Sequence, residues 1–151
     1  MAGFQVSETI NAPIEEVFDF ATSLDNTKNW LPGVISCEPV TEGEMRPGYR
    51  FKETRRQGKK EKTAEIEVVE HHRPKVHAAK AQVSSITAIY RFTFEADGHS
   101  RTRVDCVADV KATGIMKLLT GLLAKAMKSA DGKMLANLKN AIENGSSQAA
   151  A

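Results

Sequence analysis

The chain is poor in the residues and patterns that mark several large classes of protein. Its two cysteines, Cys37 and Cys106, cannot form a disulfide framework. No run of about 18 uncharged apolar residues is present, which argues against a helix that crosses a membrane. The first ten residues have neither a basic region nor an apolar core, so no secretory signal is predicted. Free thiols and a cytoplasmic location are expected.

Charge and catalytic motifs are scarce as well. The net charge of +2 is too small to indicate nucleic acid as a partner. The sequence contains no P-loop, no G-x-G-x-x-G after a strand, no H-E-x-x-H, no G-x-S-x-G and no paired C-x-x-C. His71, His72 and His99 are too weak a set to predict a metal site, because histidines in turns are usually solvated. We therefore expect no metal and no cofactor.

What remains is the composition of one globular domain. The chain has 151 residues, of which 41% are hydrophobic and 26% charged. A chain of this length buries enough surface for a core without disulfides or metals. With no internal repeat and no linker, we expect a single domain over residues 1–145 and a flexible tail over residues 146–151.

Alternating apolar and polar residues predict a mainly β chain up to about residue 110. Pro13 after the first strand favours the start of a short helix, and the Pro32-Gly33 pair marks a turn. The Asp97-Gly98 pair is a strong hairpin signal. Short connections make the strands antiparallel neighbours. The predicted strands span residues 4–10, 34–40, 49–56, 62–70, 75–82, 86–95 and 101–110.

The last part of the chain changes to helical spacing. Apolar residues recur every three or four positions from Ile115 to Ile142, which predicts one long helix. Gly132 is expected to bend this helix and Asn144-Gly145 to end it. Its lysines would also suit a helix that lies on a membrane, but the sheet needs a cover and core packing is the better interpretation.

This order of elements predicts an α+β fold, with helices on one face of a seven-stranded antiparallel sheet. The long helix is the only apolar stripe able to cover the aromatic side of the strands. A twisted sheet wrapped round one helix cannot bring all its inner surface against that helix, so we expect a cavity between them. The small residues Ala64, Ala78, Ala88 and Ala108, at plausibly inward positions, would leave volume there.

Several short motifs follow one another along the chain: Ile10 to Phe18, Trp30 to Val34, Pro47 to Phe51, Val69-Glu70 before Arg73-Pro74, Tyr90 to Phe92, Thr102 to Val104 and Gly114 to Leu119. Taken in this order, they resemble the START-like helix-grip superfamily, and within it the polyketide cyclase/dehydrase and lipid-transport group. The resemblance covers about residues 3 to 144. It implies a sheet wrapped round the C-terminal helix, with two short helices after the first strand. It fixes no single function, because the superfamily includes cyclases, lipid carriers, hormone receptors and co-chaperone domains.

Three polar residues are candidates for catalysis. Glu53 shares its parity with Tyr49 and Phe51, so it can point into the cavity and act as a general base, or pair with a nearby Arg or Lys at the sheet rim. Tyr49 can offer a hydroxyl to a ligand or pack as an ordinary core residue. His77 lies on a strand whose facing the pattern leaves open.

A larger set is predicted to line the cavity and contact a ligand, with Trp30 near the mouth either as a lid or as a cap on the short helices. The predicted ligand-binding residues are Trp30, Tyr49, Phe51, Glu53, Tyr90, Phe92, Leu119, Leu122 and Leu123.

A basic run surrounds the predicted hairpin at residues 55–62. It is either simply solvated or a weak contact for an anionic membrane or an acidic protein. Nucleic acid would need aromatic residues on the exposed face, whereas Tyr49 and Phe51 share the inner parity.

Three functions remain open. The leading hypothesis is a module that binds or carries a small hydrophobic molecule such as a lipid, polyketide, isoprenoid or aromatic compound. The first alternative is an enzyme of the cyclase/dehydratase kind, a lyase or isomerase that moves protons with Glu53, Tyr49 or His77. The second is a protein-interaction module like the co-chaperone relatives. A filled core would favour this last alternative, and an apolar cavity the carrier.

Overall fold

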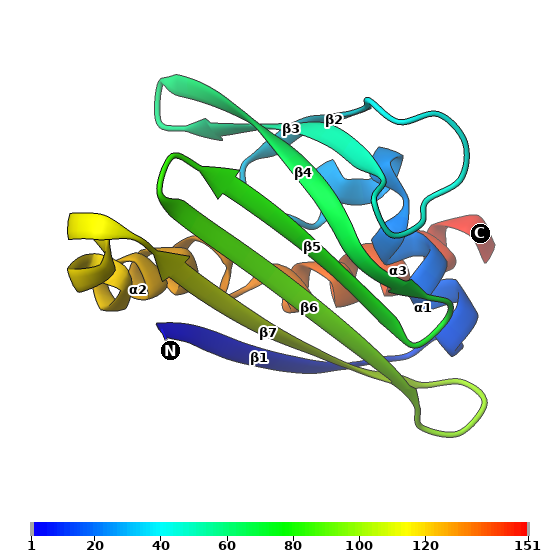
Figure 1. Ribbon diagram of the computed structural model, residues 1–151. Coiled ribbons are helices and arrows are strands. Elements are labelled where there is room, and N and C mark those ends of the chain that lie inside the picture. Colours follow the sequence, from blue (N-terminus) through cyan, green and yellow to red (C-terminus); the bar gives the residue numbers. More distant parts are fainter. Residues whose placement is uncertain (1, 151) are drawn as a thin grey trace.

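The protein is described by a computed structural model that covers the backbone of residues 2–150 and the side chains of residues 2–145. Within this part of the chain, seven strands form one antiparallel sheet in the order β1-β7-β6-β5-β4-β3-β2 (Figure 1). The predicted α+β class and the seven antiparallel strands are confirmed. The strands are β1 Ala2–Ile10, β2 Val34–Pro39, β3 Arg50–Gln57, β4 Lys60–His72, β5 Val76–Val83, β6 Ile86–Ala96 and β7 Thr102–Ala112.

The helices fall into two groups along the chain. Helix α1 (Ile14–Thr22) and the short 3₁₀ helix η1 (Leu24–Asn29) follow β1, which confirms the two short helices. After β7 come η2 (Gly114–Leu119), α2 (Thr120–Asp131) and α3 (Met134–Ala150).

The C-terminal helical segment is long and bent, as predicted, but it ends later than predicted. It is divided at Gly132, the glycine expected to bend it, where a Cβ atom would lie only 2.5 Å from the carbonyl oxygen of Lys128. The predicted end at Asn144-Gly145 is wrong, because α3 continues to Ala150. A glycine in a helix costs only about 1 kcal/mol relative to alanine, which is too little to end a helix by itself. The flexible tail at residues 146–151 stays a prediction.

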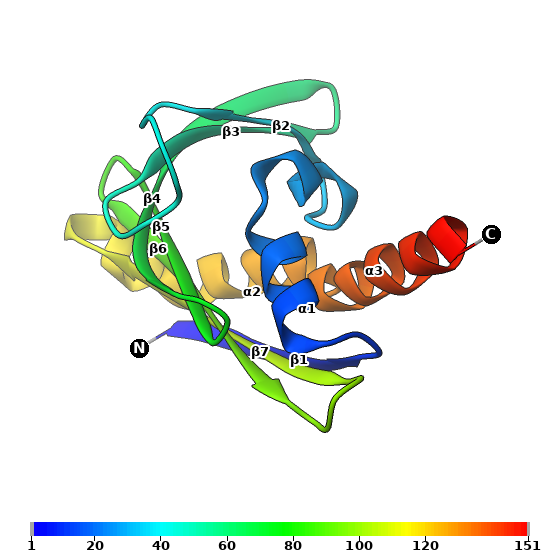
Figure 2. The same ribbon diagram turned by 90° about the vertical axis from the view of Figure 1, so that its right-hand side faces the viewer.

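The sheet curves round the helices and leaves part of its inner face uncovered (Figure 2). Helix α2 packs on β1 and β7, α3 packs on β1, and η1 packs on β2 at the other edge. The middle strands β3, β4 and β5 therefore face the space between these two contacts. This geometry is the one expected for a strongly twisted sheet around one helical segment.

Two apolar clusters lie on either side of that space. The larger joins α1 and α3 to β6, β7 and the end of β1, and includes Phe18, Phe92 and Leu138. The smaller lies on β3 and β4 and contains Tyr49, Phe51, Ile66 and Val68. The core is thus divided, and the gap between its parts is where a cavity can form.

The apolar stripe of the C-terminal segment is not buried along its whole length. Leu135 and Leu138 of α3 are fully buried, but Ile115 and Leu118 of η2 are 82% and 87% exposed. The prediction of one continuous buried stripe is wrong at this end. The reason is geometric: η2, yellow in Figure 1, extends beyond the ends of the strands and has no sheet to cover.

Neither cysteine is in a disulfide, and no helix among residues 2–150 is long and apolar enough to cross a bilayer. Burial raises the pKa of the Cys106 thiol, and burial together with the Glu53 charge raises the pKa of Cys37 to about 11. Both thiols are therefore protonated and poor nucleophiles at neutral pH.

Candidate functional site

A cavity of about 690 Å³ lies between the two apolar clusters. Small side chains on the middle strands create it, since Ala64, Ala79, Ala81 and Ala88 all line its wall. Ala64 and Ala88 were expected to point inward. On β5 the prediction of an inward Ala78 is wrong, because the opposite parity, Ala79 and Ala81, faces the cavity. Leu123, Ala126 and Met127 of α2 close the opposite side.

A chain of buried and half-buried polar groups crosses the cavity from sheet to helix. The Arg55 guanidinium on β3 donates from Nε to Glu53 Oε1 at 2.6 Å and from a terminal nitrogen to Asp131 Oδ1 at 2.9 Å. The Tyr90 hydroxyl on β6 donates to Asp131 Oδ2 at 2.6 Å. Asp131 is the last residue of α2 and is only 4% exposed. This network, Glu53–Arg55–Asp131–Tyr90, ties β3, β6 and α2 together.

The protonation of the network follows from its contacts. Burial opposes the charge on Arg55, but Glu53 and Asp131 outweigh it and raise the pKa of the guanidinium, which stays charged. Burial and the neighbouring Asp131 carboxylate raise the pKa of Tyr90, so its hydroxyl remains a donor. Two carboxylates against one guanidinium give the network a formal charge of −1. A site of this charge favours neutral or cationic groups over carboxylates.

Trp30 contributes an unsatisfied donor to the wall. Its ring packs edge-on against Phe92, with ring centroids 5.8 Å apart, and lines the cavity. The indole Nε1 is buried and has no hydrogen-bond partner among the described residues. Leaving such a donor unpaired costs about 1–3 kcal/mol. Because Nε1 is itself buried within the wall, an acceptor in the cavity would reach it only if the indole moved. Trp30 is only 4% exposed and belongs to the larger cluster, which favours the alternative that it caps the short helices.

His77 faces inward, which resolves the facing of β5. Its Nδ1 lies 3.1 Å from Nδ1 of His71, so one ring donates and the other accepts. Burial, with a smaller effect from His71, lowers the pKa of His77 from 6.5 to about 4. The imidazole is therefore neutral at pH 7 and can accept a proton only weakly.

The predicted ligand-binding residues divide into two groups. Tyr49 is buried in the smaller cluster and is not part of the wall. Leu119 and Leu122 are 40% and 66% exposed on the outside, because η2 and the start of α2 extend past the sheet. The hydrogen bonds of the described residues do not join Glu53, Tyr49 and His77 into one unit. The members that do line the cavity are Trp30, Phe51, Glu53, Tyr90, Phe92 and Leu123.

Arg55 and Asp131 were missed by sequence reasoning, although each carries a signal. Arg55 shares its parity with Phe51 and Glu53 but was grouped with the basic hairpin. Asp131 lies four residues after Met127 and three before Met134, which places it on the apolar stripe. An acid on such a stripe needs a buried partner, and only the fold brings Arg55 to it.

The basic hairpin is smaller than the sequence indicates. Arg55 points into the cavity, and Arg56 pairs with Glu61 on the surface at 3.1 Å. The hairpin keeps Lys59, Lys60 and Lys62 as exposed cations at its tip.

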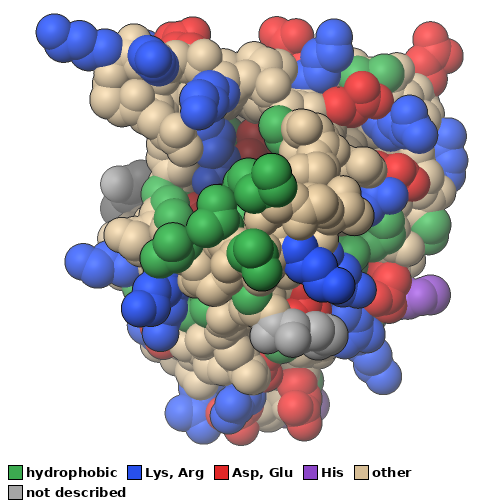
Figure 3. Space-filling model, turned by 60° about the vertical axis from the view of Figure 1, so that its left-hand side comes forward, with side chains coloured by type: hydrophobic (Ala, Val, Ile, Leu, Met, Phe, Trp, Pro, Cys, Tyr) green, Lys and Arg blue, Asp and Glu red, His purple; other side chains and the backbone are tan. Residues whose placement is uncertain are grey.

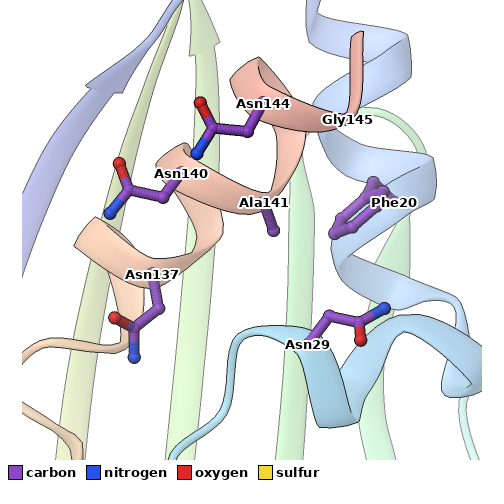
Figure 4. Close-up of a pocket in the computed structure, with 7 residues that line it drawn as sticks. All are labelled: Phe20, Asn29, Asn137, Asn140, Ala141, Asn144 and Gly145. Carbon is purple, nitrogen blue, oxygen red and sulfur yellow. The ribbon is translucent and has the colours of Figure 1, made fainter. Parts of the chain in front are cut away.

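A second hollow, of about 510 Å³, lies on the outside between α3, α1 and η1 (Figure 4). Ala141 and Phe20 point toward each other across it, whereas the Asn140 and Asn144 side chains point away from Phe20. Asn137 donates to the Trp30 carbonyl oxygen at 3.2 Å. The lining of this outer hollow has no acidic, basic or histidine side chain, so the hollow is a weaker candidate for chemistry than the inner cavity. No group of three or more metal-ligating side chains occurs among the described residues.

The family model for polyketide cyclase / dehydrase and lipid transport matches residues 1–143. The chain belongs to this family. Among curated proteins no relative matches the sequence. The predicted superfamily is thereby confirmed, whereas the family's breadth leaves ligand and reaction open.

Solved structures share the fold at low sequence identity. The di-domain ARO/CYC BexL from the BE-7585A biosynthetic pathway superposes with a TM-score of 0.80 at 16% identity, over 95% of this chain and 47% of BexL. The chain thus spans about half the length of BexL. The Zhui aromatase/cyclase from Streptomyces sp. R1128 superposes with a TM-score of 0.71 at 14% identity, over 98% of this chain and 94% of Zhui. The protein TTHA0849 from Thermus thermophilus superposes with a TM-score of 0.74 at 22% identity, over 94% of this chain and 97% of TTHA0849.

Proposed function

We propose that the protein binds a small, mainly apolar molecule in the inner cavity. The observation that carries this proposal is the volume of about 690 Å³ within a divided core. Apolar and aromatic walls with a few converging polar groups are typical of sites for small molecules. Membership of a family that includes lipid transport supports the same function.

The polar groups of the wall narrow the class of ligand. The lining is mostly apolar around one polar network, so the favoured ligand has an apolar body and a polar group that meets Glu53, Arg55 or Tyr90. The formal charge of −1 on the network disfavours a carboxylate placed beside it, whereas the Lys62 cation lies at an exposed part of the wall and would meet only a carboxylate near solvent. The favoured ligand is therefore a neutral amphiphile, such as an isoprenoid alcohol, a sterol-like alcohol or an aromatic ketone.

The test is the binding of a neutral fluorophore, N-phenyl-1-naphthylamine, to the wild type and to Ala81→Trp. Ala81 lines the cavity, so the indole fills it and the dissociation constant should rise about tenfold or more. Leu122→Trp is the matched control, because Leu122 is exposed and outside the lining. Equal affinity in wild type and Ala81→Trp would contradict the proposal. Native mass spectrometry of freshly purified protein would identify a ligand that co-purifies.

An enzyme of the cyclase/dehydratase kind is a second candidate, and Glu53 favours it. Oε1 of Glu53 is held by Arg55, while Oε2 has no partner among the described side chains. A carboxylate held in this way beside an apolar space can remove a proton from a carbon next to a carbonyl. Both oxygens of Asp131 are occupied, so Asp131 would act as a positioning residue.

Proton exchange separates the two candidates without knowledge of the natural substrate. In D₂O, an enzyme of this kind should accelerate deuterium uptake at the α-carbons of 2-tetralone, followed by NMR. Glu53→Gln should remove the acceleration but retain fluorophore binding. If the wild type binds 2-tetralone without accelerating exchange, the carrier function remains. The co-chaperone-like alternative loses its main support, because it depended on a filled core.

A further inference from the structure

The end of the molecule where η2 meets the β5–β6 turn carries an unusual set of exposed side chains. We call it the apolar patch. The turn and η2 lie side by side, because the Thr113 amide donates to the Ser85 carbonyl oxygen at 3.0 Å. Figure 3 shows apolar side chains gathered beside a recess in the surface. The patch consists of Val83, Ile115, Leu118, Leu119 and Leu122, between 40% and 87% exposed.

The chain segment that carries most of the apolar patch has charges of one sign. Residues 110–130 contain four lysines and no acidic residue. Lys111, Lys117 and Lys125 have no carboxylate within ion-pair distance among the described side chains. Elsewhere on the surface most arginines are paired, as Arg56 is with Glu61. Unpaired cations around projecting apolar side chains match an anionic lipid surface, where the lysines contact head groups and the leucines enter the acyl boundary.

The apolar patch is also continuous with the inner cavity. Val83 belongs both to the patch and to the cavity wall, next to exposed wall residues Gln57 and Lys62. Leu122 of the patch adjoins Leu123 of the wall on the same turn of α2. The cavity thus opens at the patch. A molecule leaving a bilayer under this surface would reach the cavity without crossing water.

We propose that the apolar patch docks the protein onto an anionic phospholipid bilayer, with η2 and the start of α2 inserted at the interface. Ile115 and Leu118 are more than 80% exposed and project from the surface, as side chains that enter the acyl boundary do. Among residues 115–122 the polar side chains are Lys117, whose ammonium suits lipid head groups, and Thr120, whose hydroxyl donates to the Lys117 carbonyl oxygen. This proposal goes beyond ligand binding and does not require it.

Vesicle co-sedimentation tests the docking directly. The wild type should bind phosphatidylcholine vesicles with about 30% phosphatidylserine more tightly than pure phosphatidylcholine. Raising NaCl from about 0.1 M to about 0.5 M should weaken the binding. Leu118→Glu should lower the partition coefficient about tenfold or more, and Lys117→Glu with Lys125→Glu also about tenfold.

Val40→Glu is the matched control, because Val40 is 51% exposed and lies beside Arg50, at the opposite end of β3 from the hairpin tip. It should retain most of the binding. Thermal unfolding checks that Leu118→Glu is folded, as expected for a residue that is 87% exposed. The proposal fails if the wild type binds neither vesicle, or if Val40→Glu loses as much as Leu118→Glu. A dimer that Leu118→Glu dissociates, seen by analytical ultracentrifugation without vesicle binding, would instead assign the patch to a second copy.

Discussion

The two halves of the C-terminal helical segment, η2 with α2 and then α3, have similar sequences but different surroundings in the fold. Both have apolar residues at helical spacing and scattered lysines. In α3, Leu135 and Leu138 are fully buried between α1 and the sheet, whereas in η2 and α2, Leu118 and Leu122 face outward. The division falls at Gly132, directly after Asp131. Helix α3 therefore stabilises the fold, whereas η2 and α2 form a cavity wall and an exposed surface.

The comparison is tested most strongly by removing one leucine from each half. Leu138→Ala should lower the free energy of unfolding by about 2–5 kcal/mol, because it leaves a hole in a packed cluster. Leu122→Ala should change it by less than about 0.5 kcal/mol. Urea unfolding with a common m-value measures both. Similar losses in the two variants would show that the halves are equally packed.

The pH dependence of stability at His77, a residue of the cavity wall, shows how far that wall is shielded from water. Its pKa is about 4 in the folded protein and near 6.5 in the unfolded chain. Between these values the unfolded chain binds a proton that the folded protein does not, so stability is lost as pH falls from 6.5 toward 4. The loss should reach up to about 3 kcal/mol, partly shared with the neighbouring His71.

The measurement is the free energy of unfolding as a function of pH for the wild type and His77→Gln. The difference between the two curves isolates the histidine from carboxylates that titrate in the same range. A difference that does not change between pH 6.5 and 4 would mean that His77 is not desolvated.

Two alanines provide the finest comparison. Ala108 of β7 is fully buried against packed neighbours, and Ala81 of β5 lines the cavity. Ala108→Leu should destabilise by about 1–3 kcal/mol through overpacking. Ala81→Leu should change stability by less than about 1 kcal/mol while weakening fluorophore binding. Thermal melts and the fluorophore titration give both numbers, and an equal cost at the two sites would mean that the cavity does not accommodate a larger side chain.

The sheet was predictable because its signals are local. Alternation, turn pairs such as Asp97-Gly98 and the short connections are read from neighbouring residues. Residues on β3 and β6 with a clear parity, such as Phe51 and Phe92, were correctly expected in the wall. Short-range patterns therefore fix strands and their facing well.

The site was only partly predictable because its members meet across long sequence separations. The Arg55–Asp131 pair joins residues 76 positions apart, and no local pattern states that β3 ends opposite the end of α2. The exposure of Leu118 and Leu122 depends on where the sheet stops relative to the helix. A helical stripe reveals which residues share a face, but not how far the covering surface extends.

The alanines that line the cavity have a consequence for how such a protein changes over generations. Ala79, Ala81 and Ala88 face empty volume, so replacing any of them reshapes the interior while the packed cluster around α3 keeps its contacts. New selectivity can therefore accumulate one substitution at a time without passing through unstable intermediates. In this molecule, tolerance for mutation is concentrated at the positions that decide what fits inside.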